Sequence, residues 1–261
     1  MENKLVVVIM GQNCERFIKM SLDSVKDADV IIYCDGGSTD NTLKIVDNFE
    51  YGKRLTDKYI NGEQLGTINS VIIINNKYNQ EDKTMNGKQR NFYLDYLKKN
   101  HINDWCLVLD SDEVLEDYGT DKLKQTILPI KKDMIFSPRI HHFVGDLGYE
   151  DYTKDIHYVP NRLFKVTKDL YYPETEHTVL TIKEGTIFGG YSSLDIHIWH
   201  LRECLGIFET QIKFENNLKK SNMHTERQLR QWQRDMLLGN YPKKKVHYDL
   251  IPTSIKNHFK I

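Results

Sequence analysis

The sequence predicts an α/β fold in which a mixed, mostly parallel sheet is flanked by helices. Short apolar runs alternate with segments of helical periodicity through the first half of the chain, which is the order typical of parallel sheets. Acidic residues directly follow two of these runs, and ligands of such sheets bind at the carboxyl ends of the strands. The chain has 261 residues and 39% hydrophobic content, which is enough to bury one large core.

Four apolar runs in the first half are typical of buried strands. The first is an uninterrupted run of aliphatic residues, as expected for a strand that is covered on both faces. Between the runs, apolar residues recur at helical spacing, and the second such segment follows the N-cap candidates Ser38, Thr39 and Asp40. The expected strands cover residues 5–10, 30–34, 71–74 and 105–109, and the expected helices cover residues 17–25, 43–49 and 88–99.

The second half of the chain predicts shorter elements. Strand-like pieces occupy residues 134–140, 162–166, 177–182 and 196–201, and two helical segments occupy residues 205–219 and 225–238. No repeat, low-complexity tract or Pro- or Ser-rich linker separates the two halves. We therefore expect one domain that carries a C-terminal helical extension.

The composition excludes several classes of protein. The 36 basic and 37 acidic residues give a net charge of -1, so no global basic field favours nucleic-acid binding. The four cysteines show no CxxC spacing, which argues against zinc ribbons and thioredoxin-like redox motifs. The apolar run at residues 5–10 is too short to span a bilayer. We expect a soluble, cytoplasmic protein with reduced cysteines.

An Asp-Ser-Asp sequence follows the fourth expected strand. Asp110 and Asp112 are two residues apart at a strand end, so both carboxylates can point to one side. Two hard oxygen ligands suit Mg²⁺ or Mn²⁺, which usually keeps its other positions for water and substrate phosphates. A solvated acidic turn is the structural alternative, but the position directly after an apolar strand favours a metal site.

The other acidic cluster follows the second expected strand. Asp35 could accept hydrogen bonds from a nucleobase or a ribose, and Gly36 lets the backbone approach a ligand closely. Further along the chain, Lys88 and Arg90 open a helix and could reach a diphosphate. The structural alternatives are a turn with a helix cap for the first segment and a solvated helix start for the second.

Several of these stretches occur in the order and spacing of a known family. They are VVVIMGQN near the start, the Ser24-Val25 pair, DGGSTDNT from Asp35, and KQRN from Lys88, which is followed by WCLVLDSDE. Residues 5–46 and 85–115 resemble the family-2 glycosyltransferases with the GT-A fold. Beyond residue 115 the similarity is confined to scattered pieces, such as NRLFK at 161–165, Glu176-His177, and the His-x-x-His at 197–200.

The resemblance implies a domain organisation and a metal site. A GT-A catalytic domain would cover residues 1–202, with the donor nucleotide and metal held by residues 1–115 and the acceptor by residues 116–202. The helical extension would cover residues 203–261.

The resemblance also implies roles for single residues. Asp35 would bind the nucleoside, Asp110 and Asp112 would bind Mn²⁺ or Mg²⁺, and a later histidine would complete the metal site. His200 is the expected ligand and His197 the alternative. Only one of them is expected to bind, because residues three apart on a strand point to opposite faces.

The implied reaction is the inverting transfer of a sugar from a nucleotide-sugar donor, with UDP as the expected nucleotide, to an acceptor hydroxyl. The acceptor would be a glycan, a lipid-linked molecule or a protein. A carboxylate must take the proton of that hydroxyl. Glu176 is the expected base, and Glu174, Asp151 and Asp155 are the alternatives.

Two other functions remain open at this point. Sugar-phosphate nucleotidyltransferases need a glycine-rich loop after the first strand, and the stretch from Gly11 to Arg16 lacks those glycines. A non-catalytic module that holds a nucleotide sugar or a glycan is the second alternative, and the intact Asp-Ser-Asp sequence argues against it.

Two further regions are candidates for binding an acceptor or the membrane that carries it. The aromatic segment 141–158 is a candidate sugar-binding lid, with a partly packed loop as the alternative. Basic and aromatic residues between 227 and 245 suggest, at most, weak peripheral contact with an anionic membrane. A solvated helix face is the alternative for that region.

Overall fold

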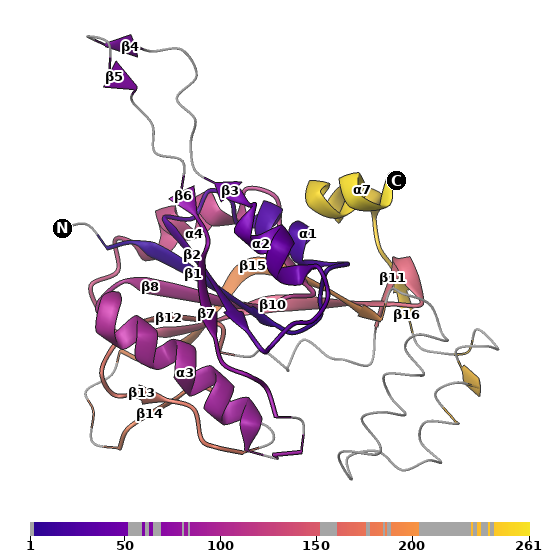
Figure 1. The fold of residues 1–261 in the computed structure, drawn as a ribbon. Coiled ribbons are helices and arrows are strands. Elements are labelled where there is room, and N and C mark those ends of the chain that lie inside the picture. The colour runs from indigo at the N-terminus through magenta and orange to yellow at the C-terminus, as the bar shows by residue number, and fades with distance from the viewer. Residues whose placement is uncertain are drawn as a thin grey trace.

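The computed structural model of the chain shows a central sheet with helices on both faces (Figure 1). It describes residues 3–51, 59–60, 63–64, 69–79, 81–82, 84–151, 161–175, 178–184, 186, 189–203, 231, 234–235, 240 and 243–261.

Parallel strands from the first half form the centre of the sheet, as the apolar runs predict. They lie side by side in the order β8 (Trp105–Asp110), β1 (Leu5–Gly11), β2 (Val30–Asp35) and β7 (Ile72–Asn75). The apolar side chains of β1 and β8 are almost all fully buried. The carboxyl ends of the strands meet at one edge, because Gly11 is in register with Asp35 and Met10 with Asp110.

The second half extends the sheet with strands of both directions. Its strands are β9 (Glu113–Leu115), β10 (Ile135–Val144), β11 (Asp146–Asp151), β12 (Leu163–Lys165), β15 (Tyr191–Glu203) and β16 (Lys243–Lys245). One edge of β10 runs parallel to β15, and its other edge pairs antiparallel with β11 and β12. β12 connects this part to β8, and β15 also pairs with β9.

The complete strand order confirms the predicted fold class. Ten described strands form one mixed sheet in the order β16-β11-β10-β12-β8-β1-β2-β7, with β15 and β9 branching from β10. β10 and β15 are both longer than the strands that the sequence predicts. The strand predicted at 177–182 is only β14 (Thr181–Ile182) among the described residues, and it pairs with β13 (Leu170–Tyr171) outside the main sheet.

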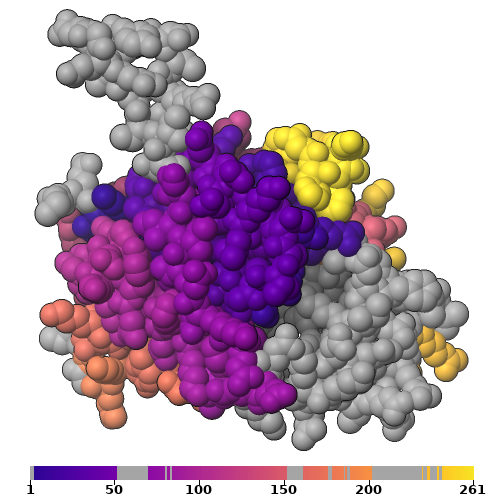
Figure 2. Space-filling model, viewed as in Figure 1, coloured from indigo at the N-terminus to yellow at the C-terminus, as the bar shows by residue number. Residues whose placement is uncertain are grey.

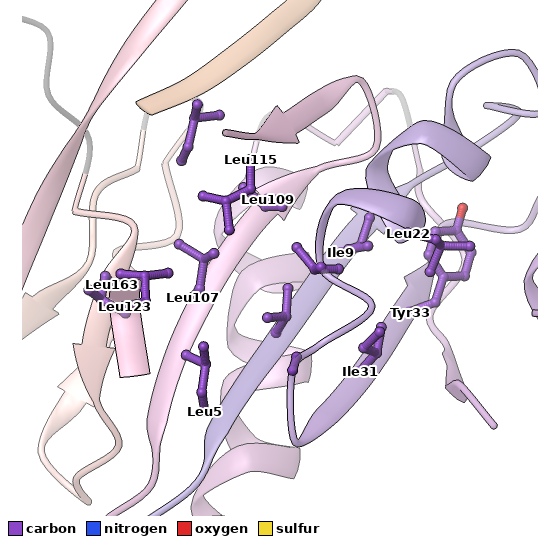
Figure 3. Close-up of a cluster of buried hydrophobic side chains, with 14 of the residues drawn as sticks. Leu5, Ile9, Leu22, Ile31, Tyr33, Leu107, Leu109, Leu115, Leu123 and Leu163 are labelled. Atoms are coloured by element: carbon purple, nitrogen blue, oxygen red, sulfur yellow. The ribbon is translucent and has the colours of Figure 1, made fainter. Parts of the chain in front are cut away.

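Helices cover both faces of the parallel strands. The helices are α1 (Ile18–Ser24), α2 (Thr42–Asp47), α3 (Met85–Asn100) and α4 (Gly119–Ile127). Leu5 and Ile9 point toward α1, α2 and α4, where they join a cluster that includes Leu22 and Leu123 (Figure 3). Residues of the opposite parity, such as Val6, pack against α3 on the other face. The sheet is thus the middle of three layers.

The C-terminal region contributes a strand as well as helices. β16 adds to the sheet beside β11, and it is followed by η1 (Tyr248–Leu250) and α7 (Thr253–Phe259). α7 packs against α1, and it forms the yellow cap next to the indigo residues in Figure 2. The helices predicted at 205–219 and 225–238 lie outside the described residues, except that residues 231 and 234–235 are helical. The region 203–261 is therefore not purely helical.

Short strand pairs complete the described structure. β3 (Glu50–Tyr51) pairs with β6 (Asn69–Ser70), and β4 (Tyr59–Ile60) pairs with β5 (Glu63–Gln64). Among the described residues, no helix has both the length and the apolar composition that crossing a membrane requires.

Candidate functional site

The two acidic clusters come together at the carboxyl edge of the parallel strands. Asp35 ends β2 and Asp110 ends β8, and β1 lies between these two strands. Ser111 donates its backbone N–H to Met10 O at 2.9 Å, which ties the Asp-Ser-Asp loop to the end of β1. The edge that the sequence predicts as the ligand-binding edge therefore carries both clusters.

The carboxylate of Asp35 organises the turn that follows it. Its Oδ2 accepts hydrogen bonds from the backbone N–H groups of Gly37 (2.8 Å) and Ser38 (2.9 Å), and its Oδ1 accepts one from Ser38 Oγ (2.5 Å). Gly37 has φ of +90°, a left-handed conformation that glycine adopts readily. Asp35 is only 2% exposed. Asp35 thus stabilises the turn that follows β2. A direct contact between Asp35 and a nucleoside stays a prediction.

Gly36 lies at a close approach of three chain segments. Its N–H donates to Gly11 O at 2.8 Å, and its carbonyl accepts from the N–H of Tyr78 at 2.8 Å. A Cβ atom at this position would lie 3.0 Å from Gln12 Cβ and 3.3 Å from Tyr78 Cβ. The absence of a side chain therefore allows this edge to close around the ends of β1 and β2.

A buried arginine binds the first aspartate of the Asp-Ser-Asp sequence. Arg162 Nη2 lies 2.8 Å from Asp110 Oδ2, and its Nη1 lies 3.3 Å from Oδ1. Arg90 Nη2 is also 3.3 Å from Oδ1. Burial raises the pKa of Asp110, but the two guanidinium groups outweigh it and hold the pKa below its usual range. Asp110 is thus a fixed anion that already has two cationic partners.

Glu113 shares this arginine. Its Oε1 accepts from Arg162 Nη2 at 2.8 Å, and its Oε2 accepts from the backbone N–H of Asp110 at 2.8 Å. Glu113 is 2% exposed, and burial raises the pKa of its carboxyl although Arg162 opposes the shift. Sequence reasoning assigned no role to Arg162 or Glu113. The hydrogen bonds of Arg162 and Glu113 hold the loop between β8 and β9 in place from its buried side.

The second aspartate faces a histidine pair. Asp112 Oδ1 lies 3.6 Å from His200 Nε2, and His200 Nδ1 lies 2.9 Å from His142 Nδ1. A neutral His200 that donates from Nδ1 presents the lone pair of Nε2 toward Asp112, which is the form that binds a metal. His197 instead pairs with His141, at 2.6 Å between Nδ1 and Nε2. The two predicted histidines therefore have different partners, and only His200 faces the acidic loop.

The donor types at this edge partly fit a divalent metal. Asp112 and His200 supply a carboxylate oxygen and an imidazole nitrogen, both of which Mn²⁺ accepts. The oxygens of Asp110 are directed to Arg162 and Arg90 instead. Among the described residues, no three His, Cys, Asp or Glu side chains are arranged to hold an ion by themselves. A metal here would need oxygen ligands from a bound substrate, as Mg²⁺ sites commonly have.

Of the two predicted phosphate-binding residues, only Arg90 contacts the acidic loop. Its side chain is 18% exposed and comes from the buried side of α3. Lys88 lies on the exposed side, where its Nζ is 2.7 Å from Asp82 Oδ2. Asp82 Oδ1 also accepts from the N–H of Thr84, so Lys88 is part of the start of α3. Lys88 has no described contact that directs it to a diphosphate.

The candidate bases are only partly described. Glu176 and Asp155 lie outside the described residues. Glu174 is exposed and its backbone lies against Gly87 of α3, where a Cβ atom would be 2.7 Å from Glu174 Cα. Asp151 is buried on β11, beside Lys243 of β16. Glu174 is thus the described carboxylate that adjoins the helix of Arg90.

The candidate lid and the basic region are likewise partly described. Residues 141–144 belong to β10 and residues 146–151 to β11, while residues 152–160 lie outside the described residues. The described start of the predicted lid is thus sheet rather than loop. In the basic region, the side chains of Lys243, Lys244 and Lys245 are exposed on β16.

Comparisons with known proteins found similarity only to solved structures. No protein-family model matches the chain, and no curated protein matches it. S. aureus TarS is 14% identical, with a TM-score of 0.43, over 91% of this chain and 43% of that chain. Glucosyl-3-phosphoglycerate synthase from Mycobacterium tuberculosis is 16% identical, with a TM-score of 0.33, over 52% of this chain and 44% of that chain.

A third solved structure is of similar size to this chain. It is 4-diphosphocytidyl-2C-methyl-D-erythritolsynthase from Anaerococcus prevotii, which is 14% identical, with a TM-score of 0.34, over 99% of this chain and 95% of that chain. The matched regions span less than half the length of each of the first two proteins.

Proposed function

We propose that this chain is a glycosyltransferase of the GT-A type, which moves a sugar from a nucleotide-sugar donor to an acceptor hydroxyl with the help of Mn²⁺ or Mg²⁺. The observation that supports it is the meeting of Asp112, His200 and Arg90 at the carboxyl edge where Asp35 ends β2. This edge combines a carboxylate–imidazole pair for a metal with a guanidinium for phosphate, which are the groups that a nucleoside diphosphate requires.

The donor would lie across the ends of β2, β1 and β8. Its nucleoside would meet the turn built by Asp35, and its diphosphate would accept hydrogen bonds from Arg90. Asp112 and His200 would hold the divalent ion, which supplies neutralisation of the charge that grows on the leaving diphosphate. Arg162 keeps Asp110 and Glu113 in place, so the loop that carries Asp112 is already ordered before a donor binds.

The acceptor hydroxyl would attack the anomeric carbon from the face opposite the diphosphate. The bond between that carbon and the acceptor oxygen forms as the bond to the diphosphate oxygen breaks, which inverts the configuration. A carboxylate takes the hydroxyl proton. Glu176 remains our proposed base, and Glu174 is the described alternative because it adjoins the start of α3.

The partners follow from the proposed reaction. UDP is the proposed nucleotide, and a glycan, a lipid-linked molecule or a protein is the proposed acceptor. The exposed lysines 243–245 on β16 support weak contact with an anionic membrane, and we propose a cytoplasmic location with no nucleic-acid partner.

Calorimetric titration of UDP tests the proposal. With Mn²⁺ present, wild-type protein should bind UDP, and chelator should weaken that binding at least tenfold. Asp112→Asn should weaken it similarly, while the control Asp121→Asn on α4 should stay within twofold of wild type. Equal UDP affinity in Mn²⁺ and in chelator would contradict the metal role, and no binding of any nucleotide would contradict the function.

A second candidate function is favoured by the arginines. Both oxygens of Asp110 are already bound to guanidinium groups, an arrangement that suits nucleotide-sugar binding without metal-assisted turnover. Donor hydrolysis separates the two functions. An enzyme should release free sugar or transfer it faster with Mn²⁺ than without, whereas a binding module should show neither reaction.

A further inference from the structure

The side chain of Asn91 holds the segment that follows β13. Asn91 Nδ2 donates to Tyr172 O at 2.8 Å, and the N–H of Tyr172 donates to Asn91 Oδ1 at 2.9 Å. One side-chain amide thereby satisfies both backbone polar groups of one residue, as a neighbouring strand would. The backbone of Tyr172 is therefore fixed to α3 at a defined position and orientation.

The next residues of that segment pack against Gly87, which lies one helical turn before Asn91. A Cβ atom at Gly87 would lie 2.4 Å from Pro173 O and 2.7 Å from Glu174 Cα. No side chain fits in that space, so only glycine allows the segment 172–175 to lie directly on the helix. The carbonyl of Pro173 also accepts from the N–H of Thr175 at 2.8 Å, which closes a turn at this point.

The side chain of Tyr172 completes the contact. Its hydroxyl lies 2.8 Å from the hydroxyl of Tyr93, and the two buried rings meet edge to face with centroids 5.9 Å apart. Arg90 Cζ lies 5.8 Å from the centre of the Tyr172 ring. Because Gly87, Arg90 and Asn91 are spaced i, i+3 and i+4, they share one face of α3. The face that presents Arg90 to Asp110 is thus the face that holds the segment 172–175.

We propose that Asn91 and Gly87 are positioning residues, which set the acceptor-side segment 172–175 relative to the donor diphosphate bound at Arg90. The inference rests on the proposed function, since it assigns the segment to the acceptor side. A glycosyl transfer needs the acceptor hydroxyl and its base within bonding reach of the donor, and small misplacements reduce the rate strongly. α3 touches the donor side through Arg90 and the segment 172–175 through Asn91, so it helps to fix the spacing between them.

The test compares Asn91→Ala and Gly87→Ala with Asn100→Ala. Asn91→Ala removes both hydrogen bonds to Tyr172, and Gly87→Ala pushes the Pro173 carbonyl away from the helix. Asn100 is the matched control, because it lies in the last turn of α3 and its Nδ2 bonds Tyr96 O of the same helix. Thermal unfolding establishes that each variant is folded at the assay temperature.

Three measurements are made on each variant. Hydrogen–deuterium exchange reports the amide of Tyr172, calorimetry with Mn²⁺ reports UDP affinity, and steady-state kinetics use the donor and acceptor identified by a panel on the wild type. In both test variants we expect at least tenfold faster exchange at Tyr172. The acceptor kcat/KM should fall roughly 10- to 100-fold, while UDP affinity stays within twofold. Asn100→Ala should match wild type in all three.

Each alternative outcome has a distinct meaning. Faster exchange at Tyr172 with control-level kcat/KM overturns the positioning role, because the contact would then be structural alone. A loss of UDP affinity as large as the loss of kcat/KM also overturns it, because the donor site would have been deformed. Wild-type protein that binds no nucleotide refutes the proposed function and this inference with it, whatever the exchange at Tyr172 shows.

Discussion

The parallel strands of the first half and the β10–β15 pair of the second half differ in the polar side chains that they carry. β8 and β1 carry apolar side chains on both faces, nearly all fully buried. β10 and β15 also bury apolar side chains, but they carry in addition a histidine pair on each face, His142 with His200 and His141 with His197. Both regions remove apolar area from water, but the second adds hydrogen bonds between histidines, whose strength changes with pH.

Arg162 connects the end of β8 to β9, the strand that pairs with β15, so its loss should have the largest effect. Arg162→Met would leave the buried carboxylate of Glu113 without its cation and Asp110 with Arg90 alone, and breaking a buried ion pair in this way typically costs about 3–5 kcal/mol. Urea unfolding followed by circular dichroism measures this loss. Arg139→Met is the control. The side chain of Arg139 is 57% exposed, and its Nε makes a surface ion pair with Asp195 Oδ1 at 3.5 Å. A loss below ~1 kcal/mol for Arg162→Met would show that the regions are stabilised independently.

A cavity in the parallel region should be nearly as costly and independent of pH. Leu107 is fully buried at the centre of β8, and truncation of such a leucine to alanine usually costs about 2–5 kcal/mol. We expect the same loss for Leu107→Ala in urea unfolding at pH 6 and at pH 8. Ile102→Ala, at an exposed position, should change stability by less than ~0.5 kcal/mol. A loss that differed between the two pH values would contradict a purely apolar origin.

The attachment of the C-terminal helix should contribute less. Asp117, in the loop before α4, accepts hydrogen bonds from the N–H of Thr253 at 2.9 Å and from its Oγ1 at 2.7 Å. Asp117→Ala removes this cap from the start of α7 and should cost about 0.5–2 kcal/mol. Thermal unfolding provides the measurement, with the exposed Asp95→Ala as the control. Unchanged stability would mean that α7 is held by its packing on α1 alone.

The smallest effect should come from the histidine pair on the far side of β15. Burial lowers the pKa of His197 below the ordinary histidine value of 6.5, and neighbouring His141 lowers it further. The unfolded chain therefore binds a proton more readily than the folded protein as pH falls through 6.5, so stability decreases toward lower pH. His197→Gln should flatten the dependence of Tm on pH between 8 and 5, and the exposed His247→Gln should not. Parallel curves for both variants would remove the contrast between the regions.

The same contrast explains how much of the fold the sequence predicts. Buried parallel strands are uninterrupted apolar runs, so β1, β2 and β8 were predictable within a residue or two at each end. β10 and β15 mix histidine, serine and charged residues with apolar ones, because their faces are only partly covered. Their patterns predicted short pieces, although the strands themselves are ten and thirteen residues long.

The candidate site was predictable where its residues lie next to a strand end. Asp35, Asp110 and Asp112 carry that local signal, and Arg90 carries it through its place in the matching motif. Arg162 lies in NRLFK, one of the scattered pieces that resemble the family, but that resemblance did not predict its bond to Asp110, which is 52 positions away in the sequence. The contact of Asn91 with Tyr172, 81 positions away, is equally invisible before the chain is folded.

The pairing of β15 has a consequence for the protein while it is being made. Among the described strands, β15 pairs with β9 and with one edge of β10, and the strand partner of Leu115 is Ile198. A ribosome adds roughly 5–20 residues per second. For several seconds, Val114, Leu115 and the open edge of β10 are therefore outside the exit tunnel without the strand that covers them. Exposed strand edges are sites of mispairing between chains, so the yield of correctly folded protein should depend on nascent-chain chaperones and on the rate of translation through residues 115–198.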